Sequence, residues 1–129
     1  MDAEAFTELV ERAFARLPRV FRDRLENVAV VVEPRPSRSL LRRMGIRPPD
    51  TLLGYYEGVP LPERGSSYGN VLPDRILIFQ EPIEAEARMS GEPVRRIVRE
   101  TLIHEVAHYF GFSDEEIEEQ LHREDEGDA

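Results

Sequence analysis

The chain has 129 residues, 40% of them apolar, a net charge of −9 and no cysteine. This length supplies one modest hydrophobic core, so we expect a single domain over residues 1–129, and the missing cysteine excludes disulfides, thiolate metal sites and a cysteine nucleophile. No apolar run reaches the roughly 18 residues of a membrane span, and the acidic N-terminus lacks an export signal, so we expect a cytoplasmic protein with no membrane partner.

The first half of the chain predicts helices and strands in alternation. Residues 2–16 space apolar side chains at helical intervals, and Pro18 ends or interrupts this helix. The β-branched run NVAVVVE, residues 27–33, predicts a buried strand. Residues 37–44 predict a short helix, and TLLGYYE, residues 51–57, predicts a second strand. Together these elements indicate a mixed fold.

The second half begins with residues 58–74, which are rich in Gly, Pro and Ser and predict a working loop or a disordered one. RILIFQ, residues 75–80, predicts a third strand with apolar alternation and the sheet edge along which a peptide could lie. Residues 82–90 predict a helix, and a longer helix follows between Pro93 and Gly111. Strands and helices of unequal length predict an α+β fold with a small mixed sheet.

The longer helix carries HEVAH, in which His104 and His108 lie one turn apart and are two of only three histidines. Its second half is apolar on nearly every side except where the two histidines and Glu105 emerge. A helix of this kind is interior, and ionisable groups on it are costly unless a partner satisfies them.

A bound metal ion is a partner that would offset the cost of burying these ionisable side chains. Side chains at i and i+4 project side by side, so the imidazoles of His104 and His108 can bind one zinc at about 2.0–2.1 Å. Glu105 lies further around the helix, where it reaches a metal-bound water as a general base. HExxH therefore encodes two ligands and a base. The alternative is a chance match, with neutral histidines hydrogen-bonded to the backbone or to a carboxylate.

A catalytic zinc takes three protein ligands, and Asp114 is the first candidate for the third. Gly111 suits the left-handed conformation that ends a helix, so the chain turns back and Asp114 follows in the string H-E-x-x-H-x-x-G-x-x-D.

Asp114 has a second interpretation. Ser113 and Glu116 form a capping box, which places Asp114 at the start of a following helix, where its charge favours the macrodipole. His122, Glu118 and Glu119 on that helix are alternative third ligands.

Two stretches, LLGYYEGVPLPERGSSYGNVLPDRILIFQEPIEAEA and EPVRRIVRETLIHEVAHYFGFSDEEIEE, resemble the small bacterial zincin-like metallopeptidase family over roughly residues 50–122. The resemblance implies a minimal metzincin-type domain, with the sheet packed against the active-site helix. It also implies that His104, His108 and Asp114 bind zinc and that Glu105 is the catalytic base. The chain departs from true metzincins because no methionine follows the third ligand, and Met89 is a candidate to replace it from upstream.

The function that these observations favour is zinc-dependent hydrolysis of peptide bonds, by a zinc-bound water with Glu105 as general base and a peptide or protein as substrate. Tyr68 and Tyr109 are candidates for stabilising the oxyanion. The sequence predicts neither the cleavage specificity nor the oligomeric state.

Two rival functions stay open, and charge patterning supplies the first. Nine acids and one base follow residue 111, and residues 123–129 form an acidic tail. The acidity argues against nucleic acid as the main partner, yet five arginines lie between residues 35 and 47 with no acid between Glu33 and Asp50. One rival is an anion- or RNA-binding module that uses the 35–47 arginines and holds a structural metal. The other is a catalytically inactive zincin-fold interaction protein.

Overall fold

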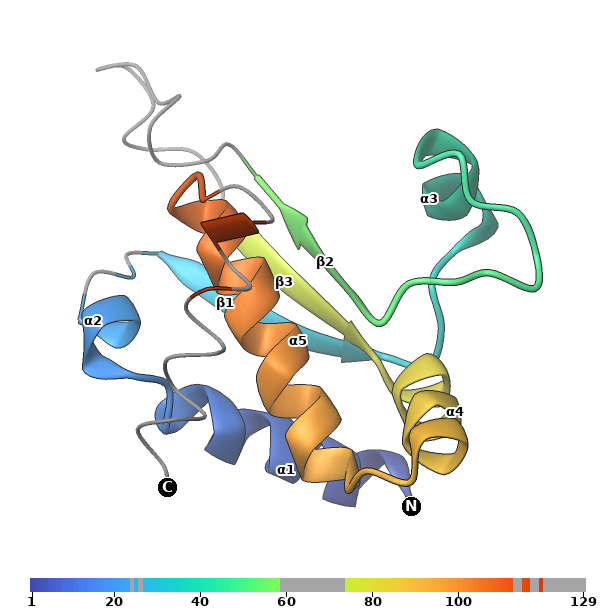
Figure 1. The fold of residues 1–129 in the computed structure, drawn as a ribbon, viewed down its shortest axis with the longest axis horizontal. Helices are drawn as coiled ribbons and strands as arrows, with labels where there is room; N and C mark the ends of the chain where they lie inside the picture. The colour runs from blue at the N-terminus through green and yellow to red at the C-terminus, as the bar shows by residue number, and fades with distance from the viewer. Residues whose placement is uncertain (24, 26, 59–73, 113–114, 117–118, 120–129) are drawn as a thin grey trace.

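A computed structural model describes the chain except residues 24, 26, 59–73, 113–114, 117–118 and 120–129. The described residues form five helices and three strands: α1 (Ala3–Ala15), α2 (Arg19–Arg22), β1 (Val28–Glu33), α3 (Arg38–Arg43), β2 (Gly54–Glu57), β3 (Asp74–Phe79), α4 (Gln80–Ser90) and α5 (Val94–Tyr109). Figure 1 shows α5 crossing one face of a small sheet, with α1 beside it. This arrangement confirms the expected α+β class. Within the described residues, no helix is long and apolar enough to cross a membrane.

Helix ends follow local sequence signals. The Asp2 side chain accepts a hydrogen bond of 2.7 Å from the N–H of Ala5 at the start of α1, and the Ser37 hydroxyl accepts one of 3.0 Å from Leu40 at the start of α3. Such caps satisfy N–H groups that lack a partner in the first helical turn. Gly91 adopts a left-handed φ of 77° after α4, which sets the short connection from α4 to α5.

The sheet has the order β1-β3-β2, with β1 parallel and β2 antiparallel to β3. The prediction that the strand at residues 75–80 forms an edge is therefore wrong, because β3 is central. The predicted alternation is also wrong, since Ile76 to Phe79 are all buried. Four consecutive apolar residues are typical of a strand that is covered on both faces. β1, expected to be buried, is an edge strand among the described residues, and its six residues are all half-buried.

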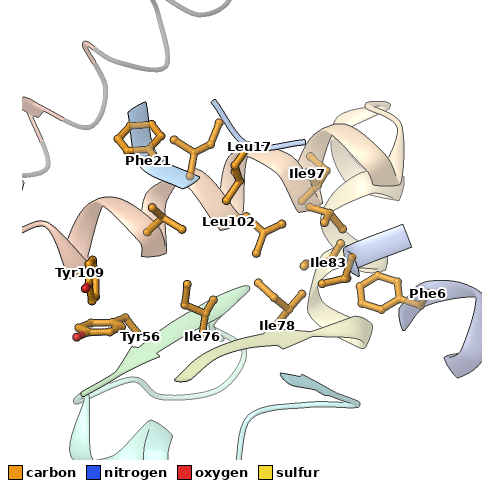
Figure 2. Close-up of a cluster of buried hydrophobic side chains, with 14 of the residues drawn as sticks. Phe6, Leu17, Phe21, Tyr56, Ile76, Ile78, Ile83, Ile97, Leu102 and Tyr109 are labelled. Atoms are coloured by element: carbon orange, nitrogen blue, oxygen red, sulfur yellow. The ribbon is translucent and has the colours of Figure 1, made fainter. Parts of the chain in front are cut away.

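The two faces of β3 enter different apolar clusters. Ile76 and Ile78 point into the main core between the sheet and the helices, where they meet residues of α1, α4 and α5 (Figure 2). Leu77 and Phe79 point to the opposite face and pack with Leu40 of α3. The second half of α5 packs against this main core. The core therefore fixes the position of the helix that carries HEVAH.

Candidate metal and catalytic site

α5 presents His104, Glu105 and His108 together, as the sequence predicts. The ligand atoms that these residues offer, one imidazole nitrogen from each histidine and one carboxylate oxygen, all lie within 4.8 Å of one another. The two imidazole rings are 4.7 Å apart between centroids and nearly perpendicular. Residues 101–103, 105–107 and 109 are buried, so this half of α5 is interior, as its apolar composition indicates.

Glu105 is the most enclosed member of the cluster. Its exposure is 7%, whereas the His108 side chain is 36% exposed. Its Oε1 accepts a hydrogen bond of 3.0 Å from the backbone N–H of Tyr56 and lies 3.2 Å from Nδ1 of His108. A buried carboxylate requires such partners. Both contacts involve Oε1, and together they hold the carboxylate in one orientation.

The contact between β2 and α5 depends on Gly54. A Cβ added to Gly54 would lie 2.7 Å from Cγ2 of Thr101, 3.0 Å from the backbone oxygen of Leu77 and 3.4 Å from Cγ of Glu105. A side chain at residue 54 would therefore push β2 away from α5 and from Glu105. Glycine within a strand pattern marks this kind of close backbone approach, and it is the sequence signal by which this contact could have been predicted.

Tyr56 connects β2 to the neighbouring strand and to the end of α5. Its hydroxyl donates a hydrogen bond of 2.5 Å to Oδ2 of Asp74, which is 3% exposed at the start of β3. Its ring meets that of Tyr109 edge-on, with centroids 6.2 Å apart (Figure 2). Sequence reasoning missed both Tyr56 and Asp74, because nothing in the local pattern indicates a pairing across 18 residues.

The end of α5 confirms the predicted role of Gly111. Gly111 has a φ of 77°, its N–H donates to the His108 carbonyl at 3.0 Å, and the N–H of Phe112 donates to the Ala107 carbonyl at 3.0 Å. These two bonds are the Schellman pattern, which ends a helix and turns the chain. The turn begins at Phe110, two residues after the second histidine.

The third zinc ligand stays a prediction. Asp114 lies outside the described residues, as do Ser113 of the expected capping box and two of the alternative ligands, Glu118 and His122. Glu119 is described and exposed, and among described residues the group of candidate ligands comprises His104, Glu105 and His108 alone.

Two suggestions about accessory residues are not supported. Tyr109 is completely buried, so it packs in the core and is not placed to contact a substrate oxyanion. Met89 is 84% exposed on α4, which does not fit a residue that underlies the histidines. Tyr68 lies outside the described residues. Among the 35–47 arginines, Arg35 forms an ion pair of 2.6 Å with Glu81.

The cluster fits zinc in its chemistry. Zinc binds imidazole nitrogens and carboxylate oxygens at about 2.0–2.2 Å. The ligand atoms of the three residues are at most 4.8 Å apart, so the rings of His104 and His108 need to move only slightly to bind one ion. His104 and His108 are both half-exposed, so an ion could reach them from solvent.

Similarity to known proteins shows the family to which the chain belongs. The family model for zincin-like metallopeptidases matches residues 25–123, and the chain belongs to that family. Among solved structures, a conserved hypothetical protein from Thermo thermophilus is 28% identical, with a TM-score of 0.56 over 85% of this chain and 94% of that one. No curated protein matches the chain.

Proposed function

We propose that this protein is a zinc-dependent metallopeptidase in which His104, His108 and Asp114 hold the metal and Glu105 is the general base. The observation that carries the proposal is the position of Glu105. It is buried beside both histidines and is held by a strand on the other side of the site. Membership of the zincin-like family supports the same assignment.

In this proposal the zinc ligands and Glu105 have different roles in the reaction. Zinc, when bound, would polarise the scissile carbonyl and acidify a water molecule. Glu105 takes a proton from that water and passes it to the leaving amine. The two Oε1 contacts keep the carboxylate oriented toward the histidines, so that little reorganisation is needed when the proton moves.

The substrate in this proposal is an extended peptide that lies along β2. Within the described residues, β2 has β3 as its one strand neighbour, so its other side is an edge. An extended peptide can add to such an edge through main-chain hydrogen bonds. The N–H of Tyr56 is bonded to Glu105, so a peptide on β2 would lie beside the general base and pair with the remaining backbone groups.

The experiment that tests the proposal is Glu105→Gln, which keeps the shape of the side chain and removes the proton acceptor. We expect zinc content to be retained and hydrolysis of a peptide library to fall by about 10²–10⁴-fold, as loss of a general base predicts. Glu100→Gln is the matched control, because Glu100 lies on the same helix and pairs with Arg96 at the surface, where an ion pair contributes little.

Two results would contradict the proposal. Loss of zinc in folded Glu105→Gln protein would make Glu105 a ligand instead of a base. Wild-type protein that holds zinc and cleaves no peptide in the library would support the inactive interaction protein instead.

A further inference from the structure

A groove of about 710 Å³ lies between α1 and the first half of α5. Five arginines line it: Arg12 and Arg16 from α1 and its C-cap, and Arg95, Arg96 and Arg99 from α5. Arg12 and Arg16 are four residues apart, as are Arg95 and Arg99, so each pair projects from one face of its helix. The groove therefore has a basic wall on each side.

The groove is separate from the candidate metal site, although α5 contributes to both. Arg95 and His104 are nine residues apart, which is about 13.5 Å along a helix and about half a turn around it. Arg95 therefore projects from the opposite side of α5 from His104, whereas Arg99 lies about 140° and Arg96 about 80° around the helix from it. None of the cluster of His104, Glu105 and His108 lines the groove.

The bottom of the groove is apolar. Leu9, Ala13 and Leu17 line it; Leu17 is buried, and Leu9 and Ala13 are partly buried against the main core. Pro93 adds a further apolar surface at the start of α5. A site with an apolar floor and a few converging charged groups, in this range of volume, is typical of a ligand site.

The positive charge of the groove is only partly balanced. Arg12 pairs with Glu8 at 3.5 Å, and Arg96 pairs with Glu92 at 3.8 Å and Glu100 at 3.0 Å. These pairs are exposed and each contributes little to stability, so a ligand can replace them at low cost. Among the described residues, no ion-pair partner faces Arg16 or Arg95, and both are exposed.

We propose that this groove binds an acidic peptide segment of another protein, with large apolar side chains between its carboxylates. Arginine binds carboxylates through two parallel hydrogen bonds, and two basic walls suit acids on both sides of a peptide. The floor formed by Leu9, Ala13 and Leu17 would receive the apolar side chains. The arginines on the walls and the apolar side chains on the floor would then both contact the peptide.

Two other occupants fit less well. Single-stranded nucleic acid is held by aromatic stacking in addition to positive charge, and no aromatic side chain is among the residues that line the groove. The acidic tail of this chain, residues 123–129, offers carboxylates but no apolar side chain larger than alanine to occupy the floor.

The test is a binding titration of the full chain with two labelled peptides, followed by fluorescence anisotropy at low salt. In one peptide glutamates alternate with leucines, and in the other serines replace the leucines. We expect the leucine peptide to bind at least about tenfold more tightly, and its affinity to fall as salt rises. Arg16→Gln with Arg95→Gln should weaken its binding by about tenfold or more, as loss of two charge-assisted bonds predicts.

The matched control is Arg42→Gln with Arg43→Gln, which removes the same charge from exposed positions on α3. An equal loss of affinity in both double variants would overturn the proposal, because it would show attraction by net charge alone. Equal binding of the two peptides would also overturn it, since the apolar floor would have no role.

Two further outcomes would assign a different occupant and so also overturn the proposal. One is tighter binding of a single-stranded RNA oligonucleotide that Arg16→Gln with Arg95→Gln abolishes. The other is peptide binding that appears only after residues 123–129 are removed, which would make the tail the occupant. The readout is binding and not hydrolysis, so failure here is distinguishable from failure of the proposed peptidase activity.

Discussion

The backbone N–H of Tyr56 donates a hydrogen bond of 3.0 Å to Oε1 of Glu105, joining β2 to α5 across 49 residues of sequence. The bond is buried, so losing it would take this acceptor from the N–H of Tyr56 in the interior and leave Oε1 of Glu105 with only its contact to His108. It makes the position of Glu105 depend on how closely β2 approaches α5. Residues that set this approach therefore act as positioning residues for the proposed general base.

Gly54→Ala tests that dependence. The added methyl group would meet Cγ2 of Thr101 at 2.7 Å, so β2 or α5 must shift. Overpacking of this kind costs about 1–3 kcal/mol, and we expect a loss of that size in the free energy of unfolding, measured by denaturant titration. We also expect peptide hydrolysis to fall while zinc content is unchanged. An equally stable and equally active Gly54→Ala protein would contradict the role given to Gly54.

A second substitution separates this steric cause from others. Thr101→Ser removes Cγ2 and keeps the hydroxyl, which donates a hydrogen bond of 2.7 Å to the Ile97 carbonyl. In the background of Gly54→Ala, it should restore part of the lost stability and activity, because the backbone oxygen of Leu77 still lies 3.0 Å from the new methyl. Additive losses in the double variant would show that the methyl of Thr101 is not the obstacle.

Tyr56→Phe removes the donor to the buried carboxylate of Asp74. We expect the free energy of unfolding to fall by about 1–3 kcal/mol, the cost of depriving a buried polar group of a partner. Tyr55→Phe is the control: it changes the same type of side chain one residue away, and Tyr55 is half-buried on the opposite face of the sheet. Equal effects of the two substitutions would show that the bond to Asp74 contributes no more than the loss of any hydroxyl on β2.

Local signals in the sequence predict the elements well. The helix at residues 2–16 appears as Ala3–Ala15, and the helix from Pro93 to Gly111 appears as Val94–Tyr109. Gly111 ends that helix as expected, because a residue without a Cβ adopts the left-handed conformation at little cost. Spacing along one helix also predicts that His104, Glu105 and His108 gather together, since i, i+1 and i+4 are fixed by helix geometry alone.

The sequence alone does not predict how the helices and strands pair and pack with one another. The order of strands depends on which partners pair, and the expectation that β3 is an edge is wrong although Ile76 to Phe79 form an unbroken apolar run. Tyr109 carries a hydroxyl and follows His108, yet the packing of Tyr56 against it makes it a core residue. The bond from Tyr56 to Glu105 joins distant segments, and no periodicity can reveal it.

Metal analysis tests the two histidine ligands. Protein purified without a chelator should hold about one zinc per chain, as a single site with three protein ligands requires. His104→Ala and His108→Ala should each abolish that stoichiometry, measured by elemental analysis of folded protein. His122→Ala, the change of the remaining histidine, should leave it unaltered if Asp114 is the third ligand. Full zinc occupancy in either α5 variant would exclude the proposed site.

Asp114→Asn distinguishes the two roles that the sequence allows for Asp114. A residue that only favours the helix macrodipole contributes a few tenths to about 1 kcal/mol, so its loss would lower stability slightly and leave zinc affinity nearly unchanged. If Asp114 is a ligand, the change puts a neutral amide in place of a charged oxygen donor. Zinc binding should then weaken by more than the roughly 10–100-fold that is typical of residues behind the ligands.

The two roles also differ in how stability depends on metal. A ligand stabilises only the zinc-loaded protein, because the metal binds the folded chain and not the unfolded one. The melting temperature of Asp114→Asn should therefore fall below that of the wild type when zinc is present, and match it when a chelator is added. A helix-dipole residue would lower it equally under both conditions. Unchanged zinc affinity would indicate that the third ligand lies in the segment after Asp114. Glu118, Glu119 and His122 would then be the next residues to substitute.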